Sequence, residues 1–226
     1  MKNRALVFGG AGQLGTQIRS CWNDWQIDAP SHSQLDIENL VEIEHYIVAC
    51  DPLVVINCAD FHNVDRCEDE PDRAFAINAI AVDRIAAICT RLGKRFVTLS
   101  TDYVFDGSHN TPYTEVDEAN PLNAYGVSKR AGESLALRHE GNILVARTCG
   151  LYGLQPSYTF IDRVLSQSRS GFAGHVADAL RCAVESKMTG IVQVVNQGPV
   201  SWFEFASTAL RFAAIDQVVI PVRASE

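Results

Sequence analysis

Short apolar runs alternate with longer amphipathic segments along most of this chain. The expected strands are brief and several are apolar throughout, at residues 4–9, 25–29, 53–59, 94–100 and 142–148. Helices are expected from the helical spacing of apolar side chains, over residues 13–22, 72–93 and 123–141. Strands buried on both faces are typical of a parallel sheet that is covered by helices. The alternation therefore predicts the α/β class with a doubly wound, Rossmann-like parallel sheet.

Composition limits the size, location and partners of the protein. A chain of 226 residues can bury one large core with a small appended lobe. Its net charge of −8 argues against nucleic-acid binding, which needs a basic face. The apolar runs are too short to span a bilayer and the start lacks a signal peptide, so we expect a cytoplasmic protein with no membrane partner. Seven cysteines and six histidines lack metal-ligand spacing, which predicts reduced thiols and no metal site.

A glycine-rich motif, "GGAGQLG", stands between the first expected strand and the first expected helix. Gly9, Gly12 and Gly15 would allow a tight turn, close approach of the backbone to a pyrophosphate, and close packing of the helix on the sheet. The helix N-terminus would then face the phosphates. We therefore expect a dinucleotide-binding domain over residues 1–150. The remaining residues, 151–226, are expected to form a small substrate lobe, partly interleaved with that domain.

Polar residues gather where the expected strand at 94–100 ends, in "STDYVFDG" at residues 100–107. A strand that stops in such a cluster either turns over the surface or delivers side chains to a site. In the following helix, "YGVSK" places Tyr125 and Lys129 one turn apart on one face. A nearby ammonium favours a phenolate, so we expect Lys129 to lower the pKa of Tyr125 and to make it a usable proton donor or acceptor.

Together these features resemble the extended short-chain dehydrogenase/reductase family, and most closely its dTDP-4-dehydrorhamnose reductases. The matching blocks cover most of the chain and read "FGGAGQLG", "VVINCADFHNVDRCEDEP", "INAIAV", "STDYVFDG", "PLNAYGVSKRAGE" and "VVNQGPVSWFEFA". The resemblance implies NAD(P)H-dependent reduction of the 4-keto group of a nucleotide-activated 6-deoxyhexose, as in dTDP-L-rhamnose biosynthesis. The implied partner is a sugar-nucleotide substrate, and a homodimer is left open.

The resemblance also implies roles for individual residues. Thr101 would hydrogen-bond the substrate carbonyl, Tyr125 would protonate its oxygen, and Lys129 would tune Tyr125 and bind the nicotinamide ribose. Besides Tyr125, Lys129 and the three glycines, the implied cofactor-binding residues are Gln13, Leu14, Ser31, His32, Asp36, Ile37, Asn57, Cys58, Ala59, Asn78 and Ser100. The implied substrate-binding residues are Asp102, Tyr103, Phe105 and Gly150. Asp102 has an equally weighted alternative as the Asx-type residue of a turn.

Two departures from the family pattern bear on the substrate. Gly150 stands where the family often has a tryptophan that packs on the sugar, and the segment after residue 170 is shorter than in the family. Two alternatives therefore stay open. One is another extended reductase or epimerase that acts on a different sugar nucleotide, and the other is a non-catalytic, dinucleotide-binding regulatory subunit.

Cofactor preference depends on the end of the second strand, where an acid would favour NAD over NADP. We expect Asp28 to lie within that strand, before its tip, and the tip itself to offer Ser31, His32 and Ser33. No acidic side chain would then lie beside the 2′ position of the cofactor ribose. NADPH should be accepted at least as well as NADH, with a modest preference that increases as His32 becomes protonated.

Overall fold

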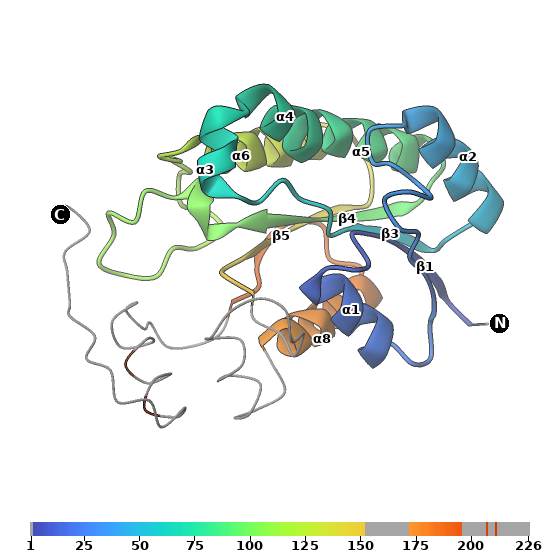
Figure 1. Cartoon of the computed structure of the whole chain (residues 1–226). Helices are drawn as coiled ribbons and strands as arrows, with labels where there is room; N and C mark the ends of the chain where they lie inside the picture. The colour runs from blue at the N-terminus through green and yellow to red at the C-terminus, as the bar shows by residue number, and fades with distance from the viewer. Residues whose placement is uncertain (1, 152–171, 196–206, 208–210, 212–226) are drawn as a thin grey trace.

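The computed structural model describes residues 2–151, 172–195, 207 and 211. Six parallel strands form one sheet in the order β2-β1-β3-β4-β5-β6 (Figure 1). The strands are β1 Arg4–Phe8, β2 Gln26–Asp28, β3 Val54–Asn57, β4 Arg95–Thr101, β5 Ile143–Thr148 and β6 Gly190–Gln193. The predicted doubly wound α/β class is confirmed.

Helices connect these strands and cover both faces of the sheet. They are α1 Gln13–Cys21, α2 Leu40–Cys50, α3 Val64–Asp69, α4 Pro71–Phe75, α5 Val82–Arg91, α6 Ala124–Leu137 and α8 Phe172–Glu185. The helix predicted over residues 72–93 is interrupted by a π-helical turn, Ala76–Ala81, between α4 and α5. In the part of the chain that the structure describes, no helix combines the length and apolarity that crossing a bilayer requires.

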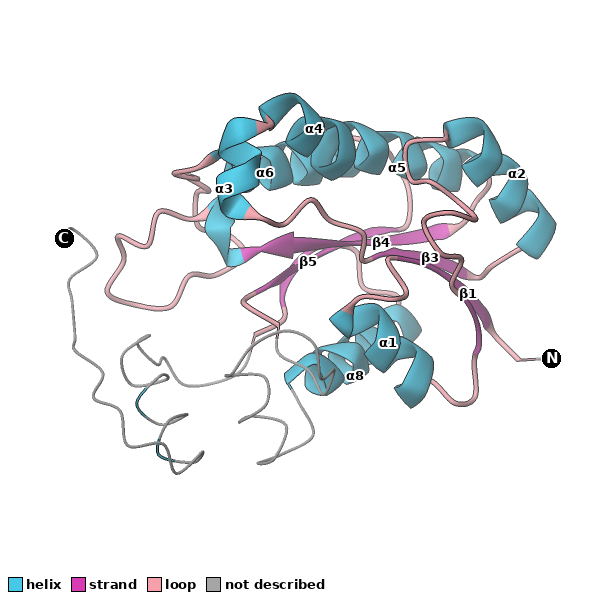
Figure 2. Ribbon diagram, in the orientation of Figure 1, coloured by secondary structure: helices cyan, strands magenta, loops and turns pink. Residues whose placement is uncertain are grey.

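The two layers of helices follow from the alternation of side chains along the strands. In β1, Ala5 and Val7 face a core shared with α1 and α8, whereas Leu6 and Phe8 face a core shared with α2 and α5. Figure 2 shows α1 and α8 on one side of the sheet and α2 to α6 on the other. Because helices cover both faces of the strands in the middle of the sheet, the sequences of these strands are continuous apolar runs.

Part of the range assigned to a substrate lobe belongs to the same sheet. β6 pairs in parallel with β5, and α8 packs against α1. The indole Nε1 of Trp22, at the end of α1, donates a hydrogen bond of 3.1 Å to the carbonyl of Ala177 in α8. Most other residues of the expected lobe lie outside the described residues.

The strand order reverses between β1 and β3, because the chain adds β2 on one side of β1 and then crosses to the other side. In open α/β sheets, ligands bind at the carboxyl ends of the strands beside such a switch point. The glycine-rich turn after β1, the loop after β3 and the polar cluster after β4 all lie at this edge, so the topology brings the predicted site together.

Candidate active site

The glycine-rich turn after β1 is built by close contacts between backbone segments. Gly9 has φ +71°, and a Cβ atom there would lie 2.6 Å from the carbonyl carbon of Cys58. A Cβ atom at Gly15 would lie 2.5 Å from the Gly9 oxygen. Gly12 caps α1 with an ordinary φ of −71°, and its Cβ position lies 3.2 Å from the Gly9 oxygen. Gly9 and Gly15 are therefore required by the turn itself, whereas a side chain at Gly12 would mainly occupy the space in front of α1.

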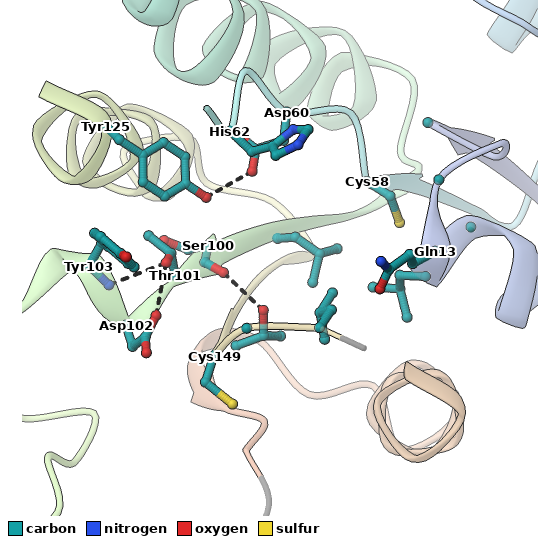
Figure 3. Close-up of a pocket in the computed structure, with 18 of the residues that line it drawn as sticks. Gln13, Cys58, Asp60, His62, Ser100, Thr101, Asp102, Tyr103, Tyr125 and Cys149 are labelled. Carbon is teal, nitrogen blue, oxygen red and sulfur yellow. Dashed lines mark hydrogen bonds between the residues drawn. The ribbon is translucent and has the colours of Figure 1, made fainter. Parts of the chain in front are cut away.

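A pocket of about 430 Å³ extends from this turn to Tyr125 (Figure 3). The sequence-predicted residues that line it are Gly9, Gly12, Gln13, Leu14, Gly15, Cys58, Ser100, Thr101, Asp102, Tyr103, Tyr125 and Gly150. Residues that line it without having been predicted are Asp60, His62, Val64, Leu99, Thr148, Cys149 and Leu151. Gln13 and Cys58 lie at one end of the view, and Tyr103 and Tyr125 lie at the other.

The pocket contains polar atoms that fit a dinucleotide. Gln13 Oε1 and Ser100 Oγ are buried without a hydrogen-bond partner, and both residues line the pocket. Buried polar atoms are normally hydrogen-bonded, so these two are available to a ligand. The N-terminus of α1 opens onto the same space, and helix N-termini bind phosphates through free N–H groups. A pyrophosphate in front of Gly12 would accept from these N–H groups. A ligand hydroxyl or amide N–H would donate to Gln13 Oε1, and Ser100 Oγ would pair with a ligand oxygen.

The polar end of β4 forms a short turn that presents its side chains to the pocket. Thr101 caps a 3₁₀ turn, Asp102–Val104, where its Oγ1 accepts a hydrogen bond of 3.2 Å from the Tyr103 amide. The same hydroxyl donates to Asp102 Oδ1 at 3.0 Å. Although the residue as a whole is exposed, desolvation of its carboxylate raises the pKa of Asp102, and the Thr101 hydrogen bond opposes the rise. Asp102 therefore takes part in the turn and also lines the pocket.

The helix that carries Tyr125 and Lys129 is held close to this turn. Asn123 caps α6 by accepting a hydrogen bond of 2.8 Å from the Gly126 amide. A Cβ atom at Gly126 would lie 2.2 Å from the Tyr103 carbonyl, so glycine permits the close approach. Lys129 is buried, does not line the pocket, and donates a hydrogen bond of 2.8 Å to the Leu99 carbonyl.

Asp60 lines the pocket beside Tyr125 and was not among the predicted site residues. The Tyr125 hydroxyl donates a hydrogen bond of 2.8 Å to Asp60 Oδ2, and Lys129 Nζ lies 3.5 Å from Asp60 Oδ1. Burial raises the pKa of Tyr125, and the charge and hydrogen bond of Asp60 raise it further, whereas Thr101 lowers it. The expected lowering of the Tyr125 pKa is therefore wrong for this structure, because burial and the adjacent carboxylate outweigh the ammonium.

Asn57 and Ala59 were predicted to bind the cofactor, but neither lines the pocket. They form part of the wall behind it. Asn57 Oδ1 accepts a hydrogen bond of 3.1 Å from the Ala59 amide, and its Nδ2 donates to Thr98 Oγ1 at 3.4 Å. Asn57 therefore folds the turn that follows β3. Cys58, between them, does line the pocket, and burial raises the pKa of its thiol to about 12.

Asn78 and Phe105 also lie outside the pocket lining. Asn78, in the π-helical turn, accepts a hydrogen bond of 2.9 Å from the Phe61 amide and donates one of 3.1 Å to the Phe61 carbonyl. It also donates to Ser128 Oγ at 3.0 Å. Phe105 stacks on Tyr113 with ring centroids 4.2 Å apart. These side chains support the wall that the neighbouring residues form.

The second strand ends differently from the prediction. β2 ends at Asp28, so the expectation that Asp28 precedes the tip is wrong. Its carboxylate accepts a hydrogen bond of 2.9 Å from the Tyr46 hydroxyl of α2. Burial, together with this hydrogen bond, raises the pKa of Tyr46 to about 12. Asp28 is thus held by α2 at the end of the strand.

The residues after β2 that were predicted to bind the cofactor do not line the pocket. Ser31 and His32 are exposed, and His32 Nδ1 lies 3.7 Å from Asp36 Oδ1. Asp36 Oδ1 also accepts a hydrogen bond of 3.0 Å from the Glu38 amide. Ile37 is buried in the core beneath α2. Ser31 and His32 therefore form an exposed rim beyond β2, with Asp36 beside it.

A parallel dinucleotide-binding sheet, with a threonine at one strand end and a tyrosine and lysine on the next helix, defines a Rossmann-fold reductase of the short-chain type. The chain belongs to the RmlD substrate binding domain family, whose model matches residues 3–171. The predicted family relationship is thereby confirmed.

Curated relatives and solved structures agree with this assignment. The chain is 31% identical over 234 residues to a dTDP-4-dehydrorhamnose reductase of Mycolicibacterium smegmatis, covering 96% of this chain and 71% of the relative. It is 30% identical over 238 residues to the spore coat polysaccharide biosynthesis protein SpsK of Bacillus subtilis, covering 99% and 84%. A crystal structure of dTDP-4-dehydrorhamnose reductase from Bacillus anthracis in complex with NADP superposes with a TM-score of 0.90 and 30% identity, covering 100% of this chain and 86% of that one.

Proposed function

We propose that this protein reduces the 4-keto group of a nucleotide-activated 6-deoxyhexose, as a dTDP-4-dehydrorhamnose reductase does in dTDP-L-rhamnose biosynthesis, with NADPH or NADH as the hydride donor. The observation that carries the proposal is one continuous pocket. The phosphate-binding turn at Gly12 lies at one end of it, and the hydroxyls of Thr101 and Tyr125 lie at the other. Relatives of this name, at about 30% identity over most of the chain, support the same reaction.

The cofactor fits the inner part of the pocket. Backbone N–H groups at the start of α1 would bind the pyrophosphate, and Gln13 and Ser100 would supply side-chain oxygens. When it is bound, the reduced nicotinamide supplies a hydride to the carbonyl carbon of the substrate. Lys129, held by the Leu99 carbonyl, would lie close to the ribose end of the site.

Tyr125 would provide the proton that the reduction consumes. Its raised pKa keeps the phenol neutral and therefore able to donate from Oη. The Thr101 hydroxyl would turn its proton from Asp102 Oδ1 to the carbonyl oxygen and hold that oxygen in line with the Tyr125 proton. Lys129 would stabilise the phenolate that remains. General acid catalysis of this kind typically contributes about 10²–10⁴-fold.

The outer part of the pocket would receive the sugar. Asp102, Tyr103 and Gly150 line it, and the edge of the Tyr103 ring contacts Tyr125 with centroids 5.6 Å apart. Gly150 leaves room that a large side chain would fill, which favours testing more than one sugar. A second candidate function is thus reduction of a different dTDP-keto sugar at the same residues.

Steady-state oxidation of NADPH and NADH tests the proposal. The purified full chain is mixed with dTDP-4-keto-6-deoxy-L-lyxo-hexulose, and loss of reduced nicotinamide is followed together with formation of the dTDP-sugar product. A second dTDP-4-keto-6-deoxyhexose serves as the comparison substrate. Turnover of either supports a reductase and ranks the sugars. Tight cofactor binding without turnover of either would contradict the proposal and favour a regulatory dinucleotide-binding subunit.

A further inference from the structure

The loop after β3 places a carboxylate against the proton donor of the site. Asp60 Oδ2 accepts the 2.8 Å hydrogen bond of the Tyr125 hydroxyl, and the two side chains point toward one another in Figure 3. Its other oxygen, Oδ1, lies 3.5 Å from Lys129 Nζ and is buried without a hydrogen-bond partner among the described residues. Asp60 thus contacts both members of the Tyr125–Lys129 pair.

The fold fixes Asp60 through the next residue of the chain. Asn78 binds both the amide and the carbonyl of Phe61, at 2.9 and 3.1 Å. Asn78 is fixed in turn to α6 through Ser128 Oγ, and a Cβ atom at Gly132 would lie 2.1 Å from the Asn78 carbonyl. Asp60 and Tyr125 are therefore held in a fixed position relative to each other, because the Asp60 loop is bonded through Asn78 to α6, the helix that carries Tyr125.

Among the three groups, Asp60 is the most accessible to water. The side chain of Asp60 is 24% exposed, whereas that of Lys129 is 4% exposed and Tyr125 is 8% exposed. Lys129 also donates one of its protons to the Leu99 carbonyl. Asp60 therefore offers a direct hydrogen-bonded route from solvent to Tyr125 Oη.

We propose that Asp60 relays protons between solvent and Tyr125, and so restores the acid form of Tyr125 after each reduction. This inference rests on the proposed reductase function. As the hydride reaches the carbonyl carbon, the C=O electron pair moves onto oxygen. The oxygen takes the proton of Tyr125 Oη and leaves a phenolate. The Asp60 carboxylate then takes a proton from solvent and passes it to the phenolate, which restores both the carboxylate of Asp60 and the phenol of Tyr125. One proton from solvent is consumed for each hydride.

A second proton route to Tyr125, through Asp102, competes with the route through Asp60 and has to be controlled for, together with the titratable groups nearby. Thr101 donates to Asp102, so an alternative relay would run through Asp102. Asp102 is more exposed than Asp60, but it accepts its hydrogen bond from Thr101, whereas Asp60 accepts directly from the Tyr125 hydroxyl. Other titratable groups around the Asp60–Tyr125 pair come from α6, α3, the loop after β3 and the turn after β4, and they include Lys129, Cys67, His62, Cys58 and Tyr103.

The first arm of the test measures the pKa of Tyr125 in the absence of substrate. The full chain is labelled with ¹³Cζ-tyrosine, the Tyr125 resonance is assigned by its loss in Tyr125→Phe, and its titration is followed in Asp60→Asn and Asp102→Asn. Asp60→Asn should lower the Tyr125 pKa, because it removes a negative charge at hydrogen-bond distance, and Asp102→Asn should lower it less. An unchanged Tyr125 titration in Asp60→Asn would overturn the proposal, whether or not the protein turns over the ketosugar.

The second arm measures turnover and separates this inference from the proposed function. Absence of wild-type turnover would reject the proposed function, and the relay with it. Where the wild type is active, Asp60→Asn should lower kcat about 10-fold or more with a smaller change in KM. In Asp60→Ala, added formate should restore part of kcat, because a small acid can replace a relay but cannot replace a structural contact. An active wild type with unchanged kcat in Asp60→Asn, or no response of Asp60→Ala to formate, would overturn the relay alone.

Discussion

Glu133→Gln is expected to destabilise the protein strongly, because it breaks a buried ion pair between α6 and β5. Glu133 and Arg147 are 1% and 2% exposed, and two hydrogen bonds of 2.8 and 2.7 Å join them. The guanidinium also lies 4.9 Å from the centre of the Phe105 ring. Glu133 stands on the same helix as Tyr125 and Lys129, and β5 leads directly into the pocket lining, so the pair connects two walls of the site.

The magnitude follows from the burial of both partners. Removing one member of a buried pair leaves an uncompensated charge and typically costs about 3–5 kcal/mol. Arg130 Nη1 lies 3.1 Å from Glu133 but is 39% exposed, so water can replace the carboxylate there. Arg147 has no such replacement, since one of its amino groups is already buried without a partner. For a chain of this size, the loss corresponds to a fall in Tm of roughly 6–20 °C.

Urea unfolding and thermal scans of wild type and Glu133→Gln measure this loss. Glu185→Gln is the matched control, because Glu185 is 48% exposed in its 2.9 Å pair with Arg181 and should cost within about 1 kcal/mol. The double variant Glu133→Leu with Arg147→Met should be more stable than Glu133→Gln, since it leaves no buried charge. A Glu133→Gln loss equal to that of Glu185→Gln would refute the reasoning.

Three further outcomes test the site. Tyr125→Phe should retain cofactor binding and lose about 10²–10⁴-fold in kcat, so wild-type turnover on the ketosugar would contradict its role as the acid. Gly12→Val should abolish cofactor binding in a fluorescence titration while the protein stays folded, whereas Gly174→Ala, whose Cβ position meets only Gln17 at 3.7 Å, should change nothing. Because the Tyr46 hydroxyl holds the Asp28 carboxylate at the end of β2, the ratio of kcat/KM for NADPH over NADH should be at least one. The ratio should rise from pH 8 to pH 6, since histidine is the side chain type that gains charge in this range. His32→Gln should remove that pH dependence, and a clear NADH preference at both pH values would show that an acid reaches the ribose.

The sheet could be predicted from the sequence because its strands are local apolar runs. Each of the five strands expected before residue 150 is present, since a run such as "VVIN" is buried at every position and fits only the middle of a covered sheet. The helix α2 was not predicted, although a signal existed. Asn39 and Glu42 follow the capping pattern of a helix start, and the Asn39 side chain accepts a hydrogen bond of 3.3 Å from the Glu42 amide.

The site was predicted less completely because part of it depends on contacts across the sheet. The π-helical turn has no local signal, since it accommodates the close approach of Gly132 on α6. Asp60 stands in a loop without periodicity, and a tyrosine distant in sequence decides its role. It could have been found from topology, because the loops after neighbouring parallel strands meet at one edge of the sheet. The pKa direction of Tyr125 was wrong for the same reason.

The contact between α1 and α8 has a consequence for how the protein is made. The glycine-rich turn leads into α1, whose far side rests on α8, and the hydrogen bond from Trp22 to Ala177 joins residues 155 positions apart. During synthesis the turn therefore leaves the ribosome long before its support does. An incomplete chain would leave Trp22 and the apolar side of α1 exposed to solvent, which favours association with other chains. The packing surface of α1 is therefore complete only when the chain has been made through α8, which ends at residue 185.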